Sequence, residues 1–421
     1  MLFLRLRHAI ALLITASLTT GLAVLAGPAA SAAAIPVSKG FFGVTDHQPS
    51  VAGAAGWPRA PIGSIRLWDT GVSWRELEVR PGVWDFRKLD KIVATSRAHG
   101  ARPLLVLGQT PRFHATRPTW VGFYGAGAPT VPKLNAWKRY VAAVAQRYRG
   151  NVDYQVWNEP NVVGMWRGSP QQMATLTYLA KHVLDVWAPN ARLVAPSFPV
   201  RLAAQRAWVA RYYAARSAGR PTGSLVDVVS LNLYPAATGS PETSMALLRQ
   251  SRAILARYHV RRPVWNTEIN YGMTGDGSNA RNISRRREAA NVTRTYVLNA
   301  ANRVGRVYWY SWDLHGLGNT EMTYGNNASL TPAGVAFNVT ATWLTGGRLR
   351  SCTVSGNGTY TCTVGSSTGV RRIYWNPSRT ASVTAVGSAT QWQGMLGKTK
   401  TLRGNERLTV SYAPIMVRSS R

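Results

Sequence analysis

Short apolar runs typical of β-strands alternate with longer segments of helical periodicity over residues 41–345. Alternation of this kind favours a parallel sheet whose strands are joined by helices. Eight runs over about 305 residues give repeats of about 38 residues, the size expected of a (β/α)8 barrel. The eight runs are Phe41–Thr45, Ser64–Trp68, Pro103–Gly108, Val152–Trp157, Arg192–Pro196, Val226–Tyr234, Pro263–Glu268 and Arg306–Trp312.

Most of these runs are followed by a segment with helical spacing of its apolar residues. An open doubly wound sheet is the alternative architecture, but no Gly-x-Gly-x-x-Gly motif follows the first run. We therefore predict an α/β fold, a (β/α)8 TIM barrel. The predicted helices are 86–99, 134–148, 170–187, 245–258, 285–302 and 331–344.

The character of the sequence changes after Gly346-Gly347, where Thr, Val, Tyr and Ser alternate between turn signals. This pattern predicts a small all-β C-terminal module resembling a β-sandwich. Its Trp375 and Trp392 could stack on sugars or belong to the core of the module. The predicted division is a signal peptide over 1–34, a catalytic barrel over 35–345 and the β module over 346–421.

The only two cysteines, Cys352 and Cys362, flank the sequence Gly356-Asn357-Gly358 symmetrically. If these three residues form a hairpin loop, the cysteines lie opposite each other and a disulfide can form. An exported protein would keep such a bond oxidised. No histidine pair or second cysteine pair suggests a metal site, and we expect no cofactor.

The first residues carry Arg5, Arg7 and His8 before an apolar stretch that ends in small residues near Ala32 and Ala34. This pattern predicts a secretory signal peptide, with an uncleaved anchor helix as the alternative. We expect the mature protein to be extracellular or associated with the cell wall. After cleavage of the signal we expect no stable membrane insertion.

The chain carries 50 lysine and arginine residues against 17 aspartate and glutamate residues, a formal net charge of +33. A field of this strength can attract nucleic acid, anionic lipid or an acidic polysaccharide. Nucleic acid is disfavoured because the basic residues, 42 of them arginine, are scattered apart from Arg285–Arg287. Two interpretations stay open: plain surface charge, and affinity for acidic cell-envelope polymers.

Two of the few acidic residues follow apolar runs at positions that suit catalysis. Glu159 lies in Trp157-Asn158-Glu159-Pro160-Asn161, and Glu268 ends the seventh run, 109 positions later. In a TIM barrel both would lie at the C-terminal ends of strands, where active sites are found. Two carboxyl groups about 5 to 5.5 Å apart can cleave an acetal with retention, one as nucleophile and one as acid/base. We predict that ionised Glu268 is the nucleophile and that it keeps Glu159 protonated as the acid.

The segments around Asn158-Glu159 and Thr267-Glu268 resemble those of the clan A retaining glycoside hydrolases, with family 39 closest and families 5 and 30 as neighbours. The resemblance implies an O-glycosyl hydrolase acting on a poly- or oligosaccharide. It also implies substrate-binding roles. Asn158 would bind the sugar 2-hydroxyl, Tyr234 would orient Glu268, Arg66 would support Glu268, and Trp309 would form the floor beneath the sugar, with Trp312 as the competing choice.

One position departs from the family 39 pattern. Xylosidases of that family carry a histidine two residues after the strand-two arginine, where Trp68 stands here. A xylosidase assignment is therefore in doubt, and Trp68, His47 and His114 are candidate sugar contacts or residues held by the protein. The aromatic loop 109–127 could wall the pocket. The alternative function is a non-catalytic, sugar-binding protein of the cell envelope.

Overall fold

The computed structural model describes residues 34–49, 56–273, 283–313, 320–325 and 328–420. The predicted signal peptide therefore lies outside the described residues, apart from Ala34. In the part of the chain that is described, no helix is both long and apolar enough to cross a membrane.

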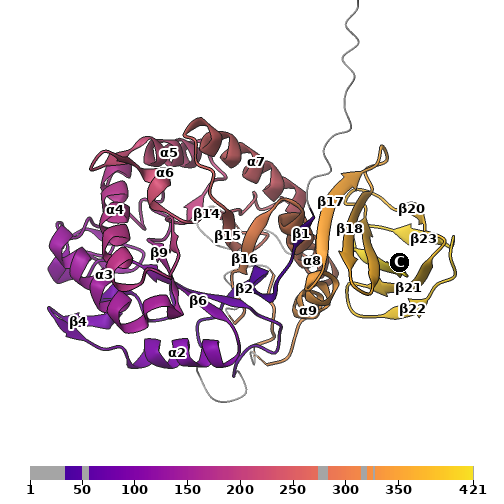
Figure 1. Cartoon of the computed structure of the whole chain (residues 1–421), viewed down its shortest axis with the longest axis horizontal. Coiled ribbons are helices and arrows are strands. Elements are labelled where there is room, and N and C mark those ends of the chain that lie inside the picture. Colours follow the sequence, from indigo (N-terminus) through magenta and orange to yellow (C-terminus); the bar gives the residue numbers. More distant parts are fainter. Residues whose placement is uncertain (1–33, 50–55, 274–282, 314–319, 326–327, 421) are drawn as a thin grey trace, which may run out of the picture. The chain divides into compact units, whose positions relative to one another are not determined.

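Eight parallel strands form the barrel, as the sequence predicts (Figure 1). The last strand pairs with the first, and the fifth is split into β10, which pairs with β9, and β11, which pairs with β14. These pairings close the sheet into a ring. The strands are β2 (Phe42–Thr45), β3 (Ser64–Leu67), β6 (Arg102–Leu107), β9 (Asp153–Val156), β10 (Leu193–Val194) with β11 (Phe198–Pro199), β14 (Val229–Asn232), β15 (Val264–Ile269) and β16 (Val304–Trp309).

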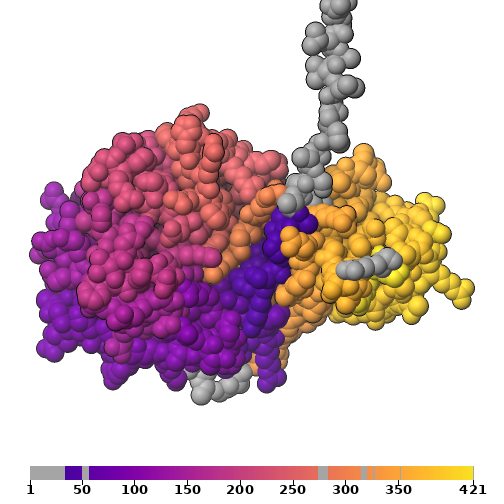
Figure 2. All heavy atoms as spheres, viewed as in Figure 1, coloured from indigo at the N-terminus to yellow at the C-terminus, as the bar shows by residue number. Residues whose placement is uncertain are grey.

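Helices surround this ring and cover the outer face of the strands (Figure 1). Figure 2 shows the same face of the molecule with all heavy atoms drawn as spheres. The six predicted helices are present, and α5 was missed because its apolar residues do not gather on one face. The long helices are α2 (Arg87–Ala98), α3 (Leu134–Tyr148), α4 (Pro170–Trp187), α5 (Ala203–Ala214), α7 (Pro241–Arg257), α8 (Arg285–Ala301) and α9 (Pro332–Leu344). Shorter elements are α1 (Trp74–Leu77), α6 (Thr222–Leu225), β4 (Glu78–Arg80), β5 (Val83–Trp84), β7 (Val121–Gly122), β8 (Gly125–Ala126), β12 (Arg216–Ser217) and β13 (Arg220–Pro221), with 3-10 turns η1 (Lys39–Phe41), η2 (Arg112–His114) and η3 (Arg149–Asn151).

Three of the outer helices begin with the same two-residue signal. Ser169, Ser240 and Thr331 each precede a proline, and each side chain accepts a hydrogen bond from a backbone N–H of the first turn. The hydroxyl satisfies a donor that the helix cannot pair, and proline fits the first helical position without losing a hydrogen bond. The sequence thus sets where α4, α7 and α9 start.

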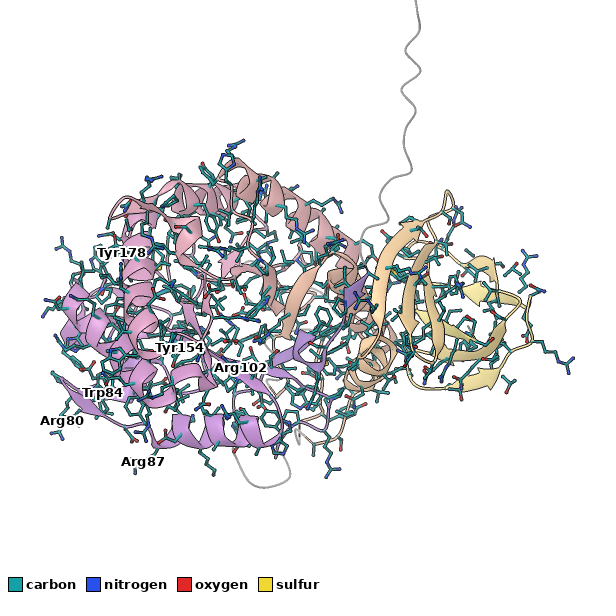
Figure 3. The ribbon with its side chains drawn as sticks, in the orientation of Figure 1. Arg80, Trp84, Arg87, Arg102, Tyr154 and Tyr178 are labelled. Carbon is teal, nitrogen blue, oxygen red and sulfur yellow. A yellow bond between two sulfur atoms is a disulfide. The ribbon has the colours of Figure 1, made fainter. Side chains whose placement is uncertain are left out.

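The N-terminal end of the barrel interior is closed by buried side chains. Leu104, Val194, Val228, Trp265 and Tyr308 pack together there. Beside them Asp153, at the start of β9, accepts hydrogen bonds from Arg102 Nη2 at 2.7 Å and Arg306 Nη1 at 3.0 Å. Arg102 lies on β6, which runs beside β9 and its Tyr154 (Figure 3). This end of the barrel has no open interior among the described residues.

The chain beyond α9 forms the predicted all-β module. A seven-stranded sheet and the pair β20–β23 share a core that includes Tyr374, Leu408 and Val417. The strands of the larger sheet, in order, are β1 (Ile35–Pro36), β17 (Arg348–Val354), β18 (Tyr360–Ser366), β19 (Gly369–Trp375), β24 (Ile415–Ser419), β21 (Ala389–Gly394) and β22 (Thr399–Thr401); the smaller pair is β20 (Ala381–Thr384) and β23 (Arg407–Val410).

The strand pairing of the module corrects one predicted domain boundary, the start of the barrel at residue 35. Residues 35 and 36 were assigned to the barrel, but Ile35 and Pro36 pair with Leu349 and Arg348 of β17. No local signal in a two-residue strand reveals a partner more than 300 positions away.

Cys352 and Cys362 face each other across β17 and β18 and form the predicted disulfide. The hairpin turn lies where the sequence placed it, with Gly358 at φ +84°. Trp375 belongs to the core: it is fully buried, stacks on Tyr360, and donates a 3.0 Å hydrogen bond to Glu242 of α7. Trp392 also packs against the core of the module, half-buried.

Candidate active site

A continuous hydrogen-bonded network fills the C-terminal half of the barrel interior. Arg66 Nε donates to Gln155 at 2.8 Å, and Gln155 Nε2 donates to Ser230 at 2.6 Å. Ser230 bonds Thr267 at 2.6 Å, and Thr267 donates to Asn232 Oδ1 at 2.8 Å. Because all five side chains are buried and mutually satisfied, they form a rigid polar layer under the mouth.

An irregularity in β15 turns Glu268 into this interior. Leu231 of β14 pairs with Asn266, but the next residue, Asn232, pairs with Glu268, so β15 carries one extra residue. Thr267 reaches Ser230 inside the barrel, and Glu268 also faces inward. Regular alternation would have sent one of these neighbours outward.

The Glu268 carboxylate is held by two groups. Arg66 Nη1 forms an ion pair with Oε1, and the Tyr234 hydroxyl donates to Oε2 at 3.2 Å. The Arg66 guanidinium is fully buried, and its other acceptors, on Gln155, Asn158 and Ser197, are all neutral. A buried guanidinium needs a counter-charge, so the negative charge belongs on Glu268. The sequence placed Arg66 and Tyr234 beside Glu268, and the structure brings all three together.

Glu159 follows β9 in a left-handed turn. Its φ is +45° and that of Trp157 is +64°, values that cost a non-glycine residue about 1 to 2 kcal/mol each. The Glu159 backbone N–H donates to Ser197 O at 3.0 Å, which holds the turn against the fifth strand. Its carboxyl Oε1 accepts a 2.7 Å hydrogen bond from Asn232 Nδ2. Backbone strain of this kind is common at functional sites.

Asn232 and Arg66 connect the two carboxyl groups. Asn232 pairs with Glu268 in the sheet and donates to Glu159, while Arg66 contacts Glu268 and Asn158, the neighbour of Glu159. Glu159 and Glu268 therefore flank the same opening at the C-terminal ends of the strands. Both glutamates lie at the C-terminal ends of strands, as expected for a barrel, while the predicted separation of their carboxyl groups stays a prediction.

The environment raises the pKa of both carboxyl groups. Burial is the main cause for Glu159, which has a neutral amide as its direct partner. Burial also raises the pKa of Glu268; the Arg66 guanidinium opposes the rise, and the charges of Glu159 and Asp69 add to it. Two acids that disfavour each other's ionisation hold one proton between them over a wide pH range. Because Arg66 fixes the charge on Glu268, the proton resides on Glu159.

Asn158 is oriented by its neighbours. Its Oδ1 accepts hydrogen bonds from Arg66 Nη2 at 2.6 Å and Ser197 Oγ at 2.8 Å. The amide nitrogen is left with a long 4.0 Å contact to the sulfur of Met165. The N–H₂ group therefore remains available as a donor beside Glu159.

A second charged cluster lies at the same mouth, after strands one, two and eight. His47 Nδ1 contacts Asp313 at 2.8 Å, and His47 Nε2 contacts Asp69 at 3.2 Å. The Tyr310 hydroxyl donates to the other oxygen of Asp69. Burial opposes the charge on His47, but its bonds to Asp313 and Asp69 outweigh burial and raise the pKa of His47 to about 10. The sequence indicated His47 but not its two acidic partners or the tyrosine bonded to one of them, because single acids and tyrosines near loops carry no pattern.

The structure does not place Trp309 at the mouth. Tyr308 faces the barrel interior, so its neighbour Trp309 faces the helices, where it is fully buried and donates to Thr320 O at 3.4 Å. Trp312 is also buried and packs on Phe337 of α9. Tyr310 is the inward aromatic residue of strand eight. The sequence located the aromatic motif of strand eight correctly, but the expectation that Trp309 faces the barrel interior was wrong.

Trp68 lies at the mouth and His114 does not. Trp68 donates a 2.8 Å hydrogen bond to the hydroxyl of Tyr124, which lies in the turn between β7 and β8 of the predicted wall loop. Burial and the charges of Asp69 and Glu268 raise the pKa of Tyr124, so its ring lies close to the site. His114 instead contacts Glu78 at 2.9 Å and is buried beneath Trp74. Of the two expected roles for His114, a residue held by the protein therefore fits these contacts better than a sugar contact.

Within the described ranges, no group of three or more His, Cys, Asp or Glu residues is arranged to hold a metal ion.

Comparison with known sequences gives a short match. No family model matches the chain. A segment of 116 residues is 31% identical to a β-xylosidase of Geobacillus stearothermophilus, covering 25% of this chain and 23% of that protein. The match thus spans about a quarter of the curated relative.

Comparison of folds extends over nearly the whole chain. A family 39 glycoside hydrolase from Bacteroides cellulosilyticus gives a TM-score of 0.69 at 18% identity, covering 91% of this chain and 82% of that one. A family 39 β-xylosidase from Caulobacter crescentus gives 0.65 at 15% identity, over 92% and 98% of the two chains. A family 30 endoxylanase from Clostridium papyrosolvens gives 0.59 at 14% identity, over 93% and 98%. The predicted likeness to the clan A glycoside hydrolase fold is confirmed.

Proposed function

We propose that the protein is an exported retaining O-glycoside hydrolase that acts on a poly- or oligosaccharide. One observation carries the proposal: two carboxyl groups lie at the mouth of the barrel, one paired with a buried guanidinium and the other bonded, among the described residues, to a neutral amide. This asymmetry gives one anion and one acid, which retaining hydrolysis requires.

In the first step Glu268 attacks the anomeric carbon while Glu159 protonates the glycosidic oxygen. The bond from carbon to the leaving oxygen breaks, and a glycosyl ester of Glu268 forms. In the second step the Glu159 carboxylate removes a proton from water, whose oxygen attacks the anomeric carbon and releases Glu268. The N–H₂ group of Asn158 is placed to bind the sugar 2-hydroxyl, a contact that strengthens in the transition state.

Arg66 and Tyr234 position the nucleophile. As the ester forms, Glu268 loses its charge and Glu159 becomes the anion, while Arg66 keeps its hydrogen bonds to three neutral acceptors. When the ester is hydrolysed, Arg66 and Tyr234 hold the released Glu268 carboxylate again. Preorganised donors of this kind stabilise charge without reorganisation during the reaction.

The substrate is proposed only as a class. The relatives named above include β-xylosidases and an endoxylanase, which makes β-xylosides the first compounds to try. Trp68, hydrogen-bonded to Tyr124, occupies the position where family 39 xylosidases are expected to carry histidine. β-Glucosides and β-galactosides therefore belong in the same panel.

Covalent trapping tests the proposal directly. Activated 2-deoxy-2-fluoro-β-glycosides of xylose, glucose and galactose should glycosylate the enzyme, with loss of the leaving group and slow turnover, and mass spectrometry of the peptides should locate the added sugar on Glu268. A label on another residue would contradict the assignment. Absence of any label, together with no reducing-sugar release from a polysaccharide panel, would favour a non-catalytic sugar-binding protein.

Export rests on the charged and apolar N-terminal segment alone. Expression in a secreting host should yield a protein in the medium whose N-terminal sequence begins near Ala33 or Ile35. Retention of the whole chain in the membrane fraction would support an anchor helix instead.

A further inference from the structure

The opposite end of the barrel carries a basic depression. Residues 259–262 join α7 to β15, at the N-terminal ends of the strands and so away from the mouth. Two adjoining hollows of about 500 and 550 Å³ flank this segment, and both are lined by His259, Val260, Arg261 and Arg262. We call them together the basal hollow.

Positive charge dominates the lining of the basal hollow. Six of its eighteen lining residues are arginine, and none is aspartate or glutamate. Arginine makes up 42 of 421 residues of the chain, so the lining has about three times the average share. The arginines are Arg216, Arg252, Arg257, Arg261, Arg262 and Arg303.

Two basic residues of the hollow occupy left-handed backbone positions. His259 has φ +55° and Arg303 has φ +56°, and each closes the end of a helix through a backbone bond, to Ala256 O and Ala300 O. Helix ends of this type usually carry glycine, which adopts positive φ without strain. Here the chain keeps a large side chain at both positions, histidine at one and arginine at the other, and both residues line the same hollow.

Two charges in the hollow, those of Arg252 and Arg303, disfavour each other. Arg252 donates to Asn302 O at the end of α8, and burial together with the charge of Arg303 lowers its pKa. A cation near a helix C-terminus is favourable by itself, which accounts for Arg252, Arg257 and Arg303 singly. It does not account for the three further arginines around a depression whose lining contains no carboxylate. A bound anion would relieve this repulsion.

We propose that the basal hollow binds the anionic groups of an acidic glycan, such as the carboxylates of polyuronate or the phosphates of a phosphodiester-linked polymer. The guanidinium fork matches both groups by paired hydrogen bonds. The headgroups of a flat lipid surface would contact the arginines of a concave lining poorly. The choice of a glycan rather than another polyanion rests on the proposed function, because the mouth at the other end would act on the same class of polymer.

The test measures binding by the intact mature protein. The probes are polygalacturonate, a poly(glycerol phosphate) and neutral dextran, titrated calorimetrically at 50, 150 and 300 mM NaCl. The hollow variant Arg261→Ala/Arg262→Ala/Arg303→Gly should lose at least about tenfold in affinity for the acidic probes and show a weaker salt dependence. The variant Arg80→Ala/Arg139→Ala/Arg286→Ala removes the same charge from exposed sites elsewhere and should bind nearly as the wild type.

The single variant Arg303→Gly separates binding from folding. Glycine suits the left-handed position, so the melting temperature should stay the same or rise by about 1 to 2 °C while affinity falls about threefold. Tighter binding of one acidic probe identifies carboxylate or phosphate as the group recognised. Equal losses in the hollow and control variants would overturn the proposal, as would tighter binding of duplex DNA than of either glycan. Failure of the proposed catalysis would appear as missing turnover and leave this binding measurement unaffected.

Discussion

Two buried carboxylates, Asp153 and Glu268, lie in the same barrel interior at opposite ends of the strands. Asp153, at the closed end, accepts from two arginines, Arg102 and Arg306, one on each oxygen. Glu268, at the mouth, has one arginine on one oxygen and a tyrosine hydroxyl at 3.2 Å on the other. Both are almost fully buried, so burial alone does not distinguish them.

The difference lies in how completely each charge is neutralised. Two guanidinium groups leave Asp153 no lone pair directed at open space, and apolar side chains close that end of the interior. Glu268 keeps an oxygen with a single weak donor, next to an acid. Under the proposed function, an ion pair is therefore structural at one end of this barrel and takes part in the reaction at the other, depending on how many partners each carboxylate has.

The largest effect should come from removing each charge in turn. Glu268→Gln should lower kcat by about 10⁴-fold or more, because the nucleophile is lost, and should also lower the melting temperature, because the buried Arg66 guanidinium loses its anion. Asp153→Asn should retain turnover and cost about 3 kcal/mol of stability, because it leaves the partly buried guanidiniums of Arg102 and Arg306 without an anion. Steady-state kinetics and thermal unfolding measure both. If Asp153→Asn folds poorly, the milder Arg306→Lys tests the same point. Loss of turnover in a well-folded Asp153 variant would break the distinction between the two ends.

Glu159→Ala should slow hydrolysis of substrates with poor leaving groups by about 10² to 10⁴-fold and affect activated aryl glycosides much less. The residual activity on activated substrates should rise with added azide, a nucleophile that needs no general base. Equal losses on good and poor leaving groups would contradict the role of Glu159 as the acid.

Glu159 should also set the alkaline limit of activity. Because burial raises the pKa of Glu159, wild-type kcat/KM should fall with rising pH at a value above the ordinary glutamate range of about 4.3. Glu159→Ala should lose this limb on activated substrates. An unchanged limb would assign it to another group.

His47 links stability at the mouth to pH. Its pKa of about 10 in the folded state lies above the ordinary value of 6.5, so its ion pairs stabilise fully below about pH 6.5 and are lost as pH rises toward 10. His47→Gln should therefore destabilise by about 2 to 4 kcal/mol at pH 6 and progressively less toward pH 10. Urea unfolding at several pH values measures the difference. A constant gap between variant and wild type would mean that His47 is uncharged.

The smallest effects compare two neighbours on strand eight. Tyr310→Phe removes the donor to Asp69 at the mouth and should lower kcat/KM by about tenfold. Trp309→Phe changes a side chain packed between the barrel and its helices, so it should lower stability by about 1 to 3 kcal/mol with turnover retained. Reversal of these results would restore Trp309 as the floor of the sugar site.

The eight strands and the pair Glu159 and Glu268 could be predicted because each depends on local pattern. Strand runs and acids at strand ends are visible in windows of about ten residues. The inward face of Glu268 could not be predicted, since it depends on an extra residue in β15 that shows only in the pairing with β14. Trp309 was misassigned for a related reason: its motif offers four aromatic residues, and only the neighbouring strands decide which of them face the interior.

The pairing of β1 with β17 has a mechanical consequence. Residues 35 and 36 join the same sheet as β24, so in the sequence the barrel is inserted between the first strand of the β module and the remaining strands of that module. Tension applied between residues 35 and 419 would load the small sheet first and reach the barrel only after β1 detached. Until β1 detaches, the β module would keep a force applied to the chain ends from reaching the strained turn at Glu159.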